Sequence, residues 1–232
     1  MGCSGTCRTE PVVGENIYQL HPSAELCWHF RDRPYQGAAP CDAEFLFVGL
    51  DANYAADIAL RPVFAQVLDY HRDGVGFWQR QGVHHPFLLP QYRGGGRRYH
   101  RNFARLGFLP QEAAQVSFVE LLHVPTVGRS NLVVADLDLD HLRMIDAAMR
   151  SGRAHHVFMP ATVVRVLRAT RLFSWLPARP SAGDLLPLLF ADTQRRIYQS
   201  LHLSNYGKFQ AQLDREADAV ARLLRQRRER LP

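Results

Sequence analysis

Short, continuous runs of apolar residues alternate along the chain with stretches in which apolar residues recur at helical spacing. The apolar runs predict buried strands, because runs of this length are typical of strands covered on both faces. They lie at residues 44–50, 116–122, 155–159 and 196–203. The helical spacing predicts helices at residues 62–70, 97–106, 137–151 and 162–170, and a long arginine-rich helix from residue 205 onward.

This alternation of strands and helices predicts an α/β fold, a three-layer α/β/α sandwich with a central, mainly parallel sheet. We find no internal repeat and no linker, so residues 1–232 are predicted to form a single domain. Residues 1–42 lack periodicity and are expected to form an irregular N-terminal extension. Residues 74–96, rich in Gly, Pro, His and aromatic residues, are expected to form a long functional loop.

Composition favours a folded protein with anionic partners. Apolar residues make up 47% of the chain, which is enough for a sizeable core, and the net charge of +6 favours nucleic acid as a partner. No apolar run reaches the roughly 20 residues that span a bilayer, and no charged-then-apolar leader opens the chain. The basic residues are almost all arginine, a bias typical of a GC-rich genome. We therefore expect a cytoplasmic, bacterial monomer without a membrane partner.

The cysteine and histidine patterns do not favour a metal or a cofactor. The four cysteines are Cys3, Cys7, Cys27 and Cys41, and no two of them form a Cys-x-x-Cys pair. Histidines occur as neighbours at residues 84–85 and 155–156, but adjacent residues on a strand point to opposite faces. We expect neither a metal site nor a bound cofactor.

Chemically capable side chains follow three of the predicted strands. Asp51 follows the first strand, Glu120 and His123 lie at the end of the second, and His202 lies at the last. The carboxyl ends of parallel strands share one edge of a sheet, where ligands bind. A carboxylate there could stabilise a sugar cation, and a neutral imidazole could stabilise a departing base. The ordinary alternatives are a turn or cap residue for Asp51 and a hydrogen-bonded buried histidine for His202.

Two motifs and the segments between them resemble the uracil-DNA glycosylase superfamily. The motifs are GLDAN at residues 49–53, where the family often has Gly-Gln-Asp-Pro-Tyr, and HLSNY at residues 202–206, where it has His-Pro-Ser-Pro-Leu. Between them lie a Pro-Phe loop at 86–87, a helix ending in Gly-Phe at 107–108, and a strand followed by Pro-Thr at 125–126. The order matches over residues 44–210.

The resemblance implies a role for each matching residue. Asp51 would assist water and stabilise the sugar cation, and His202 would hydrogen-bond O2 of the base. Phe87 would form the aromatic floor beneath the flipped base. Tyr206 would fill the gap that the base leaves in the DNA. The further residues expected to contact DNA are Ser204, Asn205, Lys208, Arg97 and Arg98.

The chain departs from the family around the base. Ala52 and Leu203 replace the motif prolines. The tyrosine that blocks the thymine methyl group is replaced by Asn53, with Tyr54 next to it, so either side chain could serve or thymine exclusion is relaxed.

Glu120 stands where an asparagine usually reads uracil. An ionised Glu120 could accept the N3–H of uracil but would repel O4, whereas a protonated one would behave differently. It could instead activate water or pair with an arginine. The residues expected to contact the base are Leu50, Asn53, Tyr54, Phe87 and Glu120.

We therefore predict a monofunctional DNA glycosylase that flips out and hydrolyses uracil, or another deaminated base, without a cofactor. Its substrate would be single- or double-stranded DNA, and its products free uracil and an abasic site. One alternative is a non-catalytic protein of the same fold that binds nucleic acid or lesions. Another is an enzyme that cleaves nucleosides, because fold alone does not determine substrate.

Overall fold

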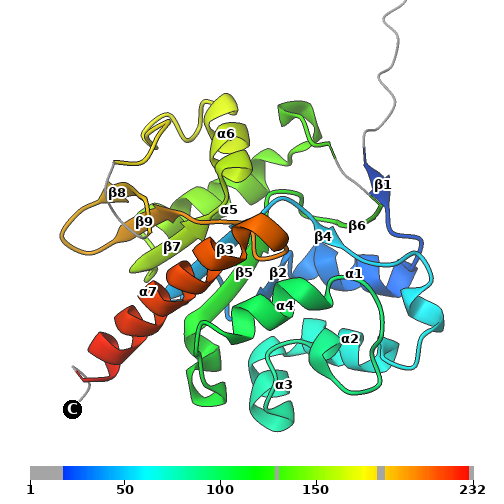
Figure 1. Cartoon of the computed structure of the whole chain (residues 1–232). Helices are drawn as coiled ribbons and strands as arrows, with labels where there is room; N and C mark the ends of the chain where they lie inside the picture. The colour runs from blue at the N-terminus through cyan, green and yellow to red at the C-terminus, as the bar shows by residue number, and fades with distance from the viewer. Residues whose placement is uncertain (1–17, 129–130, 182–185, 230–232) are drawn as a thin grey trace, which may run out of the picture.

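The computed structural model describes residues 18–128, 131–181 and 186–229. At its centre lies a six-stranded sheet of order β2-β5-β3-β7-β9-β8 (Figure 1). The four inner strands run parallel, whereas the edge strands β2 and β8 pair antiparallel with their neighbours. The strands are β2 (Tyr35–Gly37), β3 (Phe45–Gly49), β5 (Val116–Glu120), β7 (His156–Met159), β8 (Leu188–Ala191) and β9 (Arg196–Gln199).

Helices cover both faces of this sheet, which confirms the predicted α/β sandwich. Strand β3 shows why: Leu46 and Val48 face the cluster that contains α5 (Leu139–Arg150) and α6 (Ala161–Ala169). Phe45 and Phe47 face the opposite cluster, with α4 (Arg97–Ala104) and α7 (Gln210–Arg228). Alternate residues of a strand point to opposite faces, so a fully apolar strand needs a cover on each side.

A second, three-stranded sheet joins segments that are far apart in the sequence. Its order is β1 (Gln19–Leu20), β6 (Pro125–Val127) and β4 (Ala52–Asn53). Strands β4 and β6 pair in parallel. This small sheet therefore ties the segment after β3 to the segment after β5.

The N-terminal prediction was wrong for residues 18–42. Besides β1 and β2, this stretch contains α1 (Ala24–Asp32), whose N-cap Ser23 accepts a hydrogen bond from the backbone N–H of Leu26. The strands here are two and three residues long, too short to show a period. Residues 1–17 lie outside the described residues.

The predicted loop at residues 74–96 was also partly wrong. It follows α2 (Phe64–Arg72) and contains α3 (Gly74–Gln81) and a 3-10 turn at Pro86–Leu88. Two glycines hid the helix, because glycine is a poor helix former. Gly74 is required by packing, since a Cβ there would lie 2.8 Å from the backbone nitrogen of Gly37.

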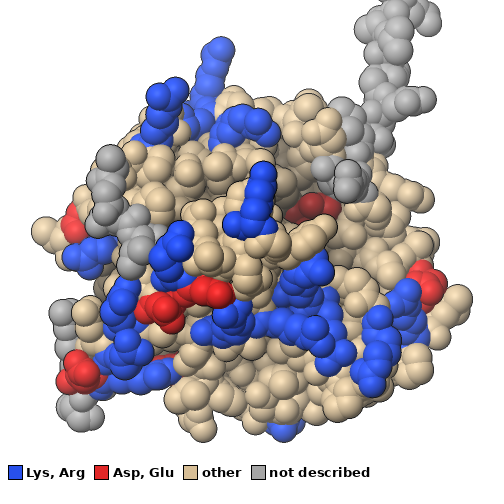
Figure 2. Space-filling model, in the orientation of Figure 1, with Lys and Arg blue, Asp and Glu red and all other residues tan. Residues whose placement is uncertain are grey.

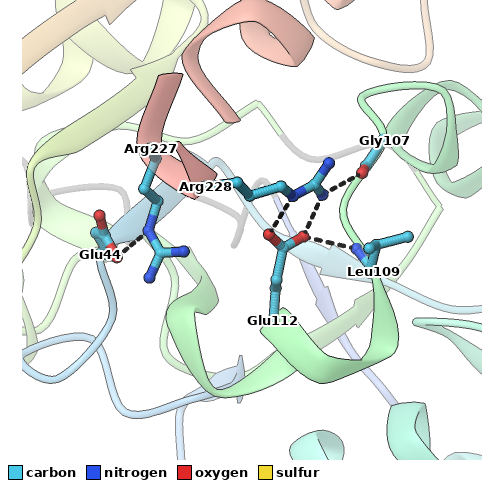
Figure 3. Close-up of polar contacts among 6 residues, drawn as sticks. All are labelled: Glu44, Gly107, Leu109, Glu112, Arg227 and Arg228. Carbon is cyan, nitrogen blue, oxygen red and sulfur yellow. Dashed lines mark hydrogen bonds and ion pairs between the residues drawn. The ribbon is translucent and has the colours of Figure 1, made fainter. Parts of the chain in front are cut away.

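Ion pairs fasten the C-terminal end of α7 to the body of the protein (Figure 3). Arg227 Nε donates to Glu44 at 2.7 Å, and Arg228 donates to both oxygens of Glu112 at 2.8 and 2.6 Å. Burial acts to raise the pKa of Glu112, but the bonds from Arg228 and from the Leu109 N–H lower it overall. Part of the arginine-rich helix is thus used for internal contacts. Among the described helices, none combines the length and apolar character that crossing a membrane requires.

Candidate active site at the carboxyl edge of the sheet

The segment that carries Asp51 and the segment that carries Glu120 lie side by side, because the preceding strands β3 and β5 pair with each other. Gly49 is the partner of Glu120 at the end of this ladder. Beyond it, the N–H groups of Leu121 and Leu122 donate to the carbonyls of Gly49 and Leu50, each at 3.0 Å. Asp51 and Glu120 therefore emerge at the same edge. Leu50, predicted to contact the base, packs in part against the hydrophobic cluster of α5 and α6.

A hydrogen-bond relay orients Asp51. The buried hydroxyl of Thr126 donates to Asp51 Oδ2 at 2.6 Å. The same hydroxyl accepts from Asn53 Nδ2 at 3.3 Å, and Asn53 also donates to the carbonyl of Gly128. Asn53, which was expected to contact the base, thus positions Asp51 through Thr126. The small sheet places these residues, because Asn53 and Thr126 are partners in its β4–β6 ladder.

The carboxyl group of Glu120 lies over the backbone of Gly49. A Cβ on Gly49 would lie 1.9 Å from Glu120 Oε2, so any side chain at this position would displace the carboxyl group. In the described part of the chain we find no hydrogen bond or ion pair to this carboxyl. Burial, together with the negative charge of Asp51, raises the pKa of Glu120 to about 8. At neutral pH Glu120 is therefore mostly a neutral acid.

His202 is neutral at neutral pH and its proton can be assigned. Burial lowers the pKa of its imidazole, and the charge of Asp51 partly offsets this effect. The backbone N–H of Ser204 donates to Nδ1 at 3.2 Å, so this nitrogen is an acceptor. The hydroxyl of Ser204 lies 2.6 Å from the same nitrogen. In the neutral ring the proton therefore sits on Nε2, which is left as a donor.

Helices α4 and α7 hold the loop that carries His202. Asn102 of α4 donates to the carbonyl of Leu203 at 2.6 Å, and Glu216 of α7 accepts from the N–H of Leu201 at 2.9 Å. Asn205 closes a turn by donating its N–H to the His202 carbonyl at 2.9 Å. The predicted last strand thus ends early, at Gln199, and a braced loop follows it.

Tyr99 belongs to this group, although the motif comparison did not select it. Its ring centroid lies 5.5 Å from that of His202. Burial and the charge of Glu120 raise the pKa of its phenol, so the tyrosine lies close to both polar groups. The spacing of Tyr99 from the buried Asn102 and Phe103 is the only signal in the sequence, since it places all three on one helix face.

Phe87 does not offer an open face for stacking in this structure, contrary to the prediction. Its side chain is 3% exposed. The Tyr92 ring stacks on it at 4.1 Å, and the His85 ring approaches edge-on at 4.6 Å. Tyr54 is also enclosed, with its hydroxyl 2.7 Å from Nε2 of His71. Both aromatics were assigned by motif position, and their burial depends on loops that motif position does not describe.

Buried histidines form a layer next to these rings. His85 and His100 stack at 3.5 Å, and His84 Nε2 lies 3.1 Å from His100 Nδ1. Burial lowers the pKa of all three, to about 3 for His100, so they are uncharged at neutral pH. Over residues 18–128, 131–181 and 186–229, no group of three His, Cys, Asp or Glu side chains could hold a metal ion.

Of the four cysteines, Cys27 and Cys41 have free thiols. Cys3 and Cys7 lie outside the described residues.

The predicted DNA-contacting residues lie beside His202 on a basic face. Figure 2 shows lysine and arginine side chains gathered in a band over α4 and α7. The guanidinium of Arg98 lies 4.0 Å from the centre of the Tyr206 ring, which is 64% exposed. Lys208 lies over the Phe209 ring at 5.2 Å. Arg97 donates to the carbonyl of Tyr92 at 3.1 Å and so also braces the loop at residues 92–97.

A hollow of about 1300 Å³ opens at the other edge of the sheet, where β7 and β9 begin. Arg153, Arg196 and Arg222 line it, together with the Arg227–Glu44 ion pair. None of the predicted site residues lines it. Hence we locate the candidate site by its chemistry, at the carboxyl edge.

No model of a known protein family matches the chain, and a search of curated proteins finds no match.

Proposed function

We propose that this protein is a DNA glycosylase that flips uracil, or another deaminated base, out of DNA and removes it by hydrolysis. The observation that carries the proposal is that Asp51 follows β3 and a neutral His202 follows β9, so that both lie at the carboxyl edge of the parallel strands. The charge of Asp51 acts on the imidazole there. A carboxylate and a neutral donor are the two groups that this reaction needs on opposite sides of the bond.

In the proposed reaction the N–C1′ bond breaks and its electron pair leaves with the base. The sugar becomes a cation, which the Asp51 carboxylate stabilises while it orients a water molecule. This water adds to C1′ and gives its proton to the Asp51 carboxylate, so that an abasic site forms; the proton then passes through solvent to the departed base anion, which leaves as the neutral base. The Nε2–H of His202 stabilises the negative charge on O2 of the departing base. Thr126 holds Asp51 in place through its 2.6 Å bond.

The basic face supports DNA as the substrate. Tyr206 is exposed and rests against the Arg98 guanidinium, next to the loop that carries His202. In this position its ring would fill the gap left by the extruded base. Arg98 and Lys208 would neutralise phosphates, and Ser204 and Asn205 would contact the strand near the lesion. Tyr99, beside His202, provides an aromatic surface near the base.

The test is cleavage of labelled DNA that contains uracil opposite guanine or adenine, or in a single strand, with hypoxanthine and thymine for comparison. Alkali then reveals abasic sites. We expect cleavage at uracil, and a loss of about 10²- to 10⁴-fold in single-turnover rate for Asp51→Asn and for His202→Ala. Asp140→Asn, on the exposed surface of α5, is the matched control and should keep the native rate.

The other outcomes identify the other functions. Tight binding to lesion DNA without cleavage by the native protein would overturn the proposal in favour of a non-catalytic binder. A clear preference for free nucleosides over DNA would overturn it in favour of a nucleoside-cleaving enzyme.

A further inference from the structure

We propose that Glu120 reads the edge of the flipped base as a neutral carboxylic acid, accepting the N3–H of uracil on one oxygen and donating its own proton to O4 from the other. This inference rests on the proposed glycosylase function and deepens it. It also defines a substrate class, namely bases in which a ring N–H stands beside a carbonyl. Uracil presents this pair at N3 and C4, and hypoxanthine presents it at N1 and C6.

The first support is the seat of the carboxyl group. Glu120 ends β5, and its backbone carbonyl accepts a hydrogen bond from His141 Nε2 at 2.7 Å. Burial lowers the pKa of His141, so this contact holds the strand end without adding charge. The side chain then lies over Gly49, where any other residue would collide with it. The acid is thus positioned by two strands and a helix.

The second support is that the carboxyl lacks a protein partner. Across the described ranges, no hydrogen bond or ion pair reaches either oxygen of Glu120. Glu120 is only partly buried, so its carboxyl group is open to a ligand, whose hydrogen bonds would replace those to water. A base edge with one donor and one acceptor would satisfy both oxygens of the neutral acid.

The third support is the set of groups that face Glu120. They are Asp51 after β3, Tyr54 after β4, Tyr70 on α2 and Tyr99 on α4. Burial raises the pKa of the three phenols, and the negative charge of ionised Glu120 raises it further. The charge of Asp51 adds to the effect of burial on the pKa of Glu120. The neighbouring imidazoles of His141 and His202 have lowered pKa values. None of these groups is a cation at neutral pH, so nothing in this set favours ionised Glu120. With a pKa of about 8, the acid keeps its proton at pH 7.

A neutral acid makes base recognition depend on pH in a way that an amide does not. Above about pH 8 the proton is lost, and the carboxylate would repel O4 while it could still accept N3–H. Uracil excision should then fall by about tenfold for each further pH unit. Glutamine has the same shape with a fixed donor and acceptor, so Glu120→Gln should remove this alkaline fall.

The experiment compares single-turnover uracil excision by the native protein, Glu120→Gln and Glu120→Ala between about pH 6 and pH 10. The alkaline fall should be present in the native protein and absent in Glu120→Gln, which should stay within about tenfold of the native rate at pH 7. Glu120→Ala should be slow at every pH, by about 10²-fold. Glu25→Gln, an exposed glutamate on α1, is the matched control and should follow the native profile.

A second measurement does not depend on activity. The infrared band of a protonated carboxyl group should be present at neutral pH, disappear on titration through about pH 8, and be missing in Glu120→Gln. The same alkaline fall in Glu120→Gln, or a native rate in Glu120→Ala, would overturn the inference and leave the glycosylase function standing. Failure of the native protein to excise any base at any pH would overturn the proposed function, and this inference with it.

Discussion

Two glutamates with restricted access to solvent, Glu112 and Glu120, have opposite surroundings. Glu112 lies in the 3-10 segment Pro110–Gln115, beside the C-terminal end of α7, and both of its oxygens accept hydrogen bonds from Arg228 (Figure 3). These bonds outweigh burial, and the pKa of Glu112 is lowered. Glu120 faces Asp51 and three phenols, and its pKa is raised to about 8. The same side chain is thus a permanent anion in one place and a neutral acid in the other.

This contrast distinguishes the carboxyl group of Glu112, which stabilises the fold, from that of Glu120, which is available to a ligand. A paired carboxylate such as Glu112 stabilises the fold, and its bonds leave little capacity for anything else. A carboxyl group without a protein partner, such as that of Glu120, lowers the stability of the fold and is available to bind a ligand. Groups whose pKa is shifted by burial and by a like charge are concentrated at functional sites. The four predictions below test this contrast.

The largest expected effect is a fall in the free energy of unfolding as the pH rises from 4.5 to about 8. The folded-state pKa of Glu120 is raised above its usual value of about 4.5, so its contribution is fully present below that pH and is lost as the pH rises through about 8. The rise in pKa from 4.5 to about 8 corresponds to a loss of about 5 kcal/mol. Urea unfolding at about pH 5, 7 and 9 should show the decline in the native protein and not in Glu120→Gln. A native-like decline in Glu120→Gln would mean that another group titrates.

Breaking the ion pair between Glu112 and Arg228 should lower the free energy of unfolding. Arg228→Ala removes the hydrogen bonds that do most to lower the pKa of Glu112, so the raising effect of burial is then opposed mainly by the bond from the Leu109 N–H. Since Arg228 is partly exposed, we expect a loss of about 2 kcal/mol in the free energy of unfolding, below the cost for a fully buried pair.

Thermal or urea unfolding measures the effect of this change. Arg225→Ala, an exposed arginine on the same helix, is the control and should change stability by less than about 0.5 kcal/mol. Equal stability of the two variants would show that the Glu112 pair contributes nothing to the fold.

Displacing the Glu120 carboxyl group from its position over Gly49 should affect catalysis more than folding. In Gly49→Ala the new Cβ would push the Glu120 carboxyl aside, and a flexible side chain can yield at a cost of about 1 kcal/mol. Uracil excision should fall by at least about tenfold because the acid is displaced from the base. Gly95→Ala is the control, since a Cβ there meets open space. Native excision by Gly49→Ala would show that the position of Glu120 is unimportant.

The smallest effect is expected on the basic face. Unlike Arg228, Arg98 has no carboxylate partner in the described ranges and rests on the Tyr206 ring at 4.0 Å. Arg98→Ala should weaken DNA binding a few-fold and reduce the slope of log affinity against log salt by about one, as expected for one lost phosphate contact. Arg143→Ala, paired with Asp140 on α5, should leave both quantities unchanged.

The local patterns of the chain determined the α/β class and where the inner strands and main helices follow one another along the sequence. Runs such as residues 44–50 and 116–122 are long and apolar enough to be read directly as buried strands. Because parallel strands end at a common edge, the strand pattern also predicts that Asp51, Glu120 and His202 lie in one region. It failed for β1, β2, β8 and α3, which are short, antiparallel or rich in glycine, and for the nine-residue helix α1.

Only the tertiary structure decided what each site residue does. Asn53 and Phe87 occupy motif positions, yet one holds Thr126 and the other is covered by Tyr92. Tyr99 came to the site through the packing of α4 against the sheet. The charge state of Glu120 depends on its burial and on Asp51, whereas that of Glu112 depends on Arg228. The hydrogen-bond partners and the burial of these side chains depend on segments that are distant in sequence, so they cannot be predicted from a pattern of neighbouring residues.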